Sequence, residues 1–75
     1  MHPYRGIKGG TGVRAYELLN NDAIEIQFKD GAVYRYSAIR PGAALVAEMR
    51  RLALLGKGLS TFISQNVREY ECRVR

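Results

Sequence analysis

The stretch that most constrains the fold of this 75-residue chain runs from Ala23 to Ser37 and reads AIEIQFKDGAVYRYS. Two runs of alternating apolar and polar residues flank Asp30-Gly31, and this pattern is the strongest short-range signal for a β-hairpin. Ile24, Ile26 and Phe28 share one face of the first strand, because successive side chains of a strand point to opposite faces. The stretch therefore predicts a hairpin with one apolar face.

The length of the hairpin loop decides where Tyr34 and Tyr36 point. A two-residue loop puts both tyrosines on the polar face and turns Arg35 toward the apolar one. A three-residue loop that ends at Gly31 moves both tyrosines to the apolar face and sets Arg35 opposite Glu25. Gly31 then takes the left-handed position of a bulge, which glycine occupies without strain. We therefore predict the three-residue loop, because a one-residue slip would turn every side chain over.

The rest of the chain predicts one small α+β domain. Alternation predicts a first strand over residues 13–19 and an edge strand over residues 69–74. Together with the hairpin, these strands make a three-stranded antiparallel meander plus a C-terminal strand, with both predicted helices packed on one face.

Two helices are predicted between the hairpin and the last strand. Leu45, Met49 and Leu52 recur at helical spacing and predict a main helix over residues 43–55, with Pro41 in its first turn. A short second helix follows, starting at residue 59 or 60 and ending near residue 67. Residues 1–12 contain four glycines and are predicted to be a flexible basic arm, so residues 13–75 make up the domain.

Three stretches, in this order, resemble the KTSC domain: GVRAYEL, IEIQFKDGAVYRY and MRRLALLGKGLSTFISQNV, which together span about residues 12–70. The family is named for its occurrence at the C-terminus of some lysyl-tRNA synthetases, and it also occurs as small stand-alone bacterial and phage proteins. Its Tyr-x-Tyr motif after a glycine turn is matched by Gly31, Tyr34 and Tyr36, to which we assign a structural role. Similar proteins tend to carry Asn where Ser60 stands. The resemblance implies an association with RNA.

The residues offer no catalytic or metal-binding constellation. His2 is the single histidine and Cys72 the single cysteine, and no motif brings them together as a nucleophile and its base. No group of His, Cys and carboxylate residues has metal-ligand spacing. The glycines at 9–12 and 56–58 fit neither the dinucleotide-binding nor the Walker pattern. We therefore predict a protein that is not an enzyme and that uses no cofactor or metal.

The charge balance favours a nucleic-acid partner. Twelve Lys and Arg stand against seven Asp and Glu, a net charge of +5, and such a basic excess suits a phosphate backbone. The cations gather around the main helix and in or next to the arm. The predicted nucleic-acid contacts, for RNA in preference to DNA, are Arg40, Arg50, Arg51 and Lys57 around the helix and Arg5, Lys8 and Arg14 near the arm. The alternative is an ordinary solvated helix face beside a disordered basic arm.

Two other interpretations stay open. Tyr34 and Tyr36 would form a base-stacking platform if their face of the sheet were open to solvent, although the preferred register favours core packing. The chain would instead be a protein-interaction module, encoded by a phage or mobile element, if strand 69–74 docked on a larger complex.

Size and composition bound the remaining properties. A chain this short buries only about 60% of its unfolded surface, so a homodimer is a further way to bury apolar area. One cysteine forms no internal disulfide, and no apolar run approaches the roughly 18 residues of a membrane span. These features predict a cytoplasmic protein without a membrane partner.

Overall fold

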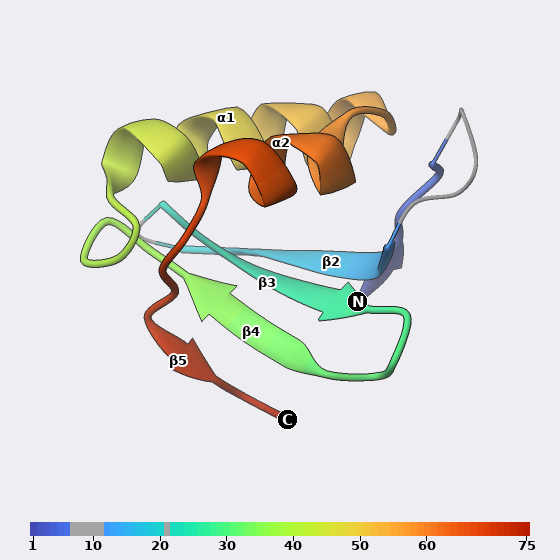
Figure 1. The fold of residues 1–75 in the computed structure, drawn as a ribbon, viewed down its shortest axis with the longest axis horizontal. Coiled ribbons are helices and arrows are strands. Elements are labelled where there is room, and N and C mark those ends of the chain that lie inside the picture. The colour runs from blue at the N-terminus through green and yellow to red at the C-terminus, as the bar shows by residue number, and fades with distance from the viewer. Residues whose placement is uncertain (7–11, 21) are drawn as a thin grey trace.

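The computed structural model describes residues 1–6, 12–20 and 22–75. Within these residues, five strands form one antiparallel sheet in the order β1-β2-β3-β4-β5, and two helices lie together on one face of it (Figure 1). The α+β class predicted from the sequence is confirmed. The elements are β1 (His2–Pro3), β2 (Val13–Leu19), β3 (Ala23–Phe28), β4 (Val33–Tyr36), α1 (Ala43–Leu55), α2 (Leu59–Asn66) and β5 (Cys72–Arg73).

The hairpin of β3 and β4 has the predicted three-residue loop. Ile26 lies opposite Tyr34, and the backbone N–H of Gly31 donates to the carbonyl of Phe28 at 2.9 Å. Gly31 has a φ of 92°, in the left-handed region that side chains with a Cβ rarely adopt. The turn at Gly31 and the alternation of apolar residues on either side therefore agree on the register of the central strands.

The core lies between the sheet and the two helices. Ile24 and Ile26 of β3 are fully buried there, as are Val46 and Met49 of α1 and Leu59 of α2. This thin layer is what a two-layer domain of this size can bury. The cluster of buried residues comprises Tyr4, Val13, Ile24, Ile26, Tyr36, Val46, Met49, Leu52, Ala53, Leu59 and Val67.

A β-bulge on β2 explains the imperfect alternation of residues 13–19. Val13 pairs with Phe28 whereas Ala15 pairs with Gln27, so Arg14 is an extra residue on its strand. The bulge returns Val13 to the buried side of the sheet and leaves Arg14 exposed.

The start of the chain contributes a strand that the sequence analysis did not foresee. β1 pairs with β2 through His2–Tyr16 and Pro3–Ala15. Tyr4 is only 7% exposed, and its hydroxyl accepts a hydrogen bond from the backbone N–H of Leu59 at 3.0 Å. Residues 1–6 are thus part of the folded body, while residues 7–11 of the predicted arm, Lys8 among them, lie outside the described residues.

Two element boundaries differ from the prediction. Pro41 lies outside α1, because the helix begins at Ala43 and Gly42 is its N-cap residue. The last strand is shorter than the predicted 69–74, since regular pairing covers only Cys72–Arg73. The backbone N–H groups of Glu71 and Val74 nevertheless donate to carbonyls of β4, each at 2.7 Å.

Candidate nucleic-acid interface

Arg50 is engaged inside the fold. From the middle of α1 its Nη1 donates to the carbonyl oxygens of Leu19 at 3.0 Å and Ala23 at 2.7 Å. These two residues pair with each other across the β2–β3 turn, and a carbonyl oxygen in a strand ladder still has a second lone pair that a side chain can use. Arg50 is half-buried, so its role in this arrangement is to close the turn onto the helix.

Arg51 and Arg40 also do not belong to one continuous basic face of the helix. Arg51 donates from Nε and Nη2 to the carboxylate of Glu48, one turn earlier on α1. This ion pair raises the pKa of Arg51 and lowers that of Glu48, and it leaves the pair without net charge. Arg40 is exposed before the start of α1 and Lys57 after its end, about 20 Å apart along a 13-residue helix. The four cations around the helix therefore do not form one patch.

A different set of cations does lie together. The side chain of Arg5 runs over Gly56, where an added Cβ would lie 3.1 Å from the Cβ of Arg5, and Lys57 follows directly. On the other side, Arg14 donates from Nη2 to the carbonyl of Lys29 at 3.3 Å. We call Arg5, Arg14, Lys29 and Lys57 the basic end; all four are exposed.

Gly12 joins the two halves of the basic end. Its N–H donates to the hydroxyl of Ser60 at 3.1 Å, on the first turn of α2. Its carbonyl accepts the N–H of Lys29 at 2.9 Å, at the β3–β4 loop. Figure 1 shows the α1–α2 turn, the β3–β4 loop and β1 at this same end of the molecule. The fold therefore gathers cations that lie as far apart in the sequence as Arg5 and Lys57.

The cations of the basic end keep their charge available. Among the described residues, none of the four forms an ion pair. Asp30 is the acidic residue beside them; its Oδ1 accepts the N–H of Ala32 at 2.9 Å and so closes the loop. Counting Asp30, the end carries a net charge of +3. Lys29 was not among the predicted contacts, because its place beside Gly12 depends on strand pairing across the sheet.

The residues of the Tyr-x-Tyr motif have unequal surroundings. Tyr36 is 4% exposed, and burial, with Tyr34 nearby, raises its pKa to about 12. Its ring belongs to the core, as the register predicted. Tyr34 is half-buried: its ring centroid lies 5.8 Å from that of Phe28 and 4.6 Å from that of Tyr70.

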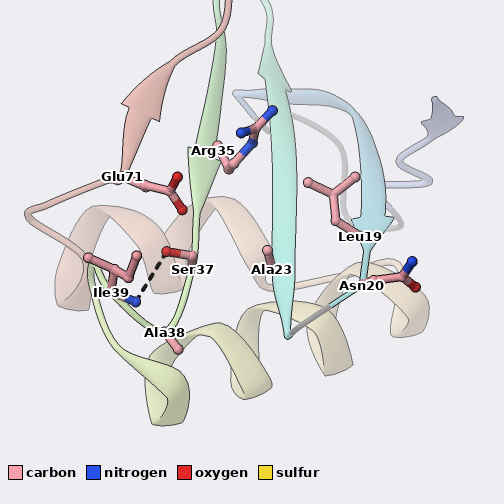
Figure 2. Close-up of a pocket in the computed structure, with 8 residues that line it drawn as sticks. All are labelled: Leu19, Asn20, Ala23, Arg35, Ser37, Ala38, Ile39 and Glu71. Carbon is pink, nitrogen blue, oxygen red and sulfur yellow. Dashed lines mark hydrogen bonds between the residues drawn. The ribbon is translucent and has the colours of Figure 1, made fainter.

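A shallow pocket lies on the side of the sheet away from the helices (Figure 2). Its volume is about 420 Å³. Arg35 borders it, and this guanidinium already donates from Nε and Nη2 to Glu25 at 3.0 and 2.8 Å, which raises the pKa of Arg35. The paired charge and the mixed lining select no class of small molecule. The lining residues are Leu19, Asn20, Ala23, Arg35, Ser37, Ala38, Ile39 and Glu71.

Other kinds of site find no support in the described part of the chain. Residues 1–6, 12–20 and 22–75 contain no group of three or more side chains suited to hold a metal ion. Neither helix found there is long and apolar enough to cross a bilayer.

Comparison with protein-family models, with curated proteins and with solved structures finds no match to this chain. The resemblance to the KTSC domain therefore stays a prediction made from the residues.

Proposed function

We propose that this protein is a non-catalytic nucleic-acid-binding domain whose basic end holds the phosphate backbone. The observation that carries the proposal is the gathering of Arg5, Arg14, Lys29 and Lys57 at one end of the fold, exposed and without ion pairs among the described residues. Phosphate contacts of this kind give affinity that is blind to sequence. The resemblance to the KTSC domain favours RNA over DNA.

The test is the salt dependence of binding to short labelled RNA and DNA, measured by fluorescence anisotropy. Each contacted phosphate of a single strand contributes about −0.7 to the slope of log K against log salt, so four contacts give a slope of about −3. The double variant Lys29→Ala/Lys57→Ala should lower the affinity for all sequences alike and reduce the slope to about half.

A matched control removes the same charge elsewhere. Arg40→Ala/Arg51→Ala takes two cations from outside the basic end and should leave the slope unchanged. Equal losses of affinity in both double variants would mean that only the net charge of the protein matters, and this result would contradict a defined interface. Undetectable binding to RNA and DNA at low salt would overturn the proposal.

A second candidate function, docking on a larger protein, is favoured by one observation. Ile39 is 78% exposed at the rim of the pocket described above, and a large apolar side chain in that position suits a protein partner. A partner that co-purifies in fixed stoichiometry should be lost on Ile39→Glu and kept on Leu54→Glu, which changes another exposed apolar residue. Equal retention in both variants would contradict docking at this pocket.

A further inference from the structure

We infer that the nucleic acid bound at the basic end is single-stranded and that its bases stack on a row of aromatic rings that begins there. The inference rests on the proposed function and adds the class of ligand. We call Phe28, Tyr34 and Tyr70 the aromatic row.

The three rings of the aromatic row lie side by side although they come from different segments. The centroids of Phe28 and Tyr34 are 5.8 Å apart with an edge-on angle of 67°, and those of Tyr34 and Tyr70 are 4.6 Å apart at 55°. The guanidinium of Arg73 lies 5.6 Å from the centre of the Tyr34 ring, within reach of a cation–π contact. We expect these contacts to restrict rotation of the rings, which lowers the entropy cost of stacking a ligand on them.

Exposure increases along the row. Phe28 and Tyr34 are half-buried against the core, whereas Tyr70 is 45% exposed. A core tyrosine would be covered on both faces, but Tyr70 lies over Tyr34 and presents surface to solvent. The row therefore ends in a ring that solvent reaches, and solvent-accessible rings stack bases in single-strand-binding proteins.

The row is continuous with the basic end. Phe28 directly precedes Lys29, and Lys29 is held at the basic end through its bond to Gly12. Phe28 is the last residue of β3 and shares the face of Ile24 and Ile26. A strand whose phosphates contact Lys29 therefore reaches the first ring of the row by passing around this end of the sheet.

The charges near Tyr70 suit base stacking and not phosphate binding. Glu69 and Glu71 flank it, balanced by Arg68 and Arg73, so this part of the surface has no cationic excess to attract phosphate. A neutral base on the ring suits this balance, while the phosphates stay at the basic end. In a duplex the base faces are stacked on one another, which removes this contribution.

The test replaces the open ring and measures binding to a single-stranded pyrimidine oligonucleotide and to a duplex of the same length. Tyr70→Leu keeps apolar bulk but removes the π face, and it should weaken single-strand binding about tenfold. Duplex affinity and the salt slope should stay unchanged, because no phosphate contact is lost. Tyr70→Phe, the matched control, keeps the ring and should bind within about twofold of the original chain.

A second readout follows the rings directly. The chain has five tyrosines and no tryptophan, so its intrinsic fluorescence comes from tyrosine, and stacked bases should quench it in the original chain more than in Tyr70→Leu. Unchanged single-strand affinity in Tyr70→Leu, alongside a loss in Lys29→Ala/Lys57→Ala, would overturn the stacking inference and leave the proposed function standing. Absence of any nucleic-acid binding by the original chain would overturn both.

Discussion

The two ends of the sheet differ in how far their cations are committed to the fold. At the β2–β3 turn, Arg50 is half-buried and donates to the carbonyls of both Leu19 and Ala23. At the basic end, Asp30 and Gly12 make backbone hydrogen bonds, Arg14 makes one exposed bond to the carbonyl of Lys29, and all four cations stay exposed. Counting charges in the sequence cannot separate structural from available cations, because the count does not show which of them the fold buries against backbone carbonyls.

The largest expected effect removes the arginine of the β2–β3 turn. Arg50→Met keeps much of the side-chain length but removes two hydrogen bonds from the guanidinium to backbone carbonyls, which should cost about 1–3 kcal/mol of unfolding free energy. Urea unfolding measures it. Nucleic-acid affinity of the folded variant should not change, and a loss of affinity in the still-folded protein would break the contrast between the two ends.

Arg51→Met is the control for that variant. Its guanidinium is exposed and paired only with Glu48, so the urea midpoint should stay within error of the original. A drop in the urea midpoint as large as that of Arg50→Met would show that losing either arginine of α1 destabilises the fold equally, and it would contradict a special role for Arg50.

The next effect tests the anchor beneath the basic end. Tyr4→Phe removes the hydroxyl that accepts the N–H of Leu59, and a buried donor without a partner should cost about 1–2 kcal/mol. Thermal and urea unfolding measure the loss. Tyr70→Phe removes a hydroxyl from an exposed ring and should cost nothing measurable; equal costs would argue against a special anchor at Tyr4.

A third change strains the backbone of the β3–β4 loop at Gly31 and leaves the charges of the basic end unaltered. Gly31 has a φ of 92° and open space where a Cβ would stand, so Gly31→Ala should cost about 1–2 kcal/mol from backbone conformation alone. Gly31→Asn should cost less, because Asn tolerates left-handed conformations. Both variants should bind nucleic acid like the original while folded, and chemical denaturation ranks them.

The smallest effect near neutral pH concerns the core that joins the two ends. The pKa of Tyr36 is raised to about 12 in the folded chain, while an unfolded tyrosine titrates near 10. The folded state therefore binds the proton more tightly, so this contribution to stability is complete below pH 10 and is lost as the pH rises from about 10 to about 12. Tyrosinate absorbance should show one late-titrating ring, absent in Tyr36→Phe. A normal titration of all the tyrosines would contradict its burial.

Sequence reasoning succeeded where the determinants are local. The three-residue loop at Gly31 follows from Gly31 itself and from alternation on either side, and α1 ends at Gly56 as its spacing and glycine indicate. It missed what depends on distant contacts. It did not predict the β1 strand or two long-range hydrogen bonds. The bond between Tyr4 and Leu59 joins residues 55 positions apart, and the bond between Gly12 and Ser60 joins residues 48 positions apart. No periodicity in the sequence indicates such pairs.

The candidate site divides along the same line. A basic excess near α1 was visible in the sequence, but the bonds of Arg50 to the β2–β3 turn were not, because nothing local reveals which carbonyls the fold brings within reach of this side chain. Lys29 was overlooked for the converse reason: its hydrogen-bond partners at the basic end, Gly12 and Arg14, come from the neighbouring strand region and not from nearby positions in the sequence. The assignment of Tyr36 to the core needed only the register and was confirmed.

The order of the strands in the sheet has a consequence for how the chain folds. Each strand pairs with the next one along the chain. Both helices lie between β4 and β5, whereas no helix lies between β2 and β3 or between β3 and β4. Loop closure of that length is slower than a hairpin, so we expect the C-terminal strand to dock last, after the β3–β4 hairpin has formed. Pulsed hydrogen exchange should then protect the amide of Gly31 before those of Glu71 and Val74.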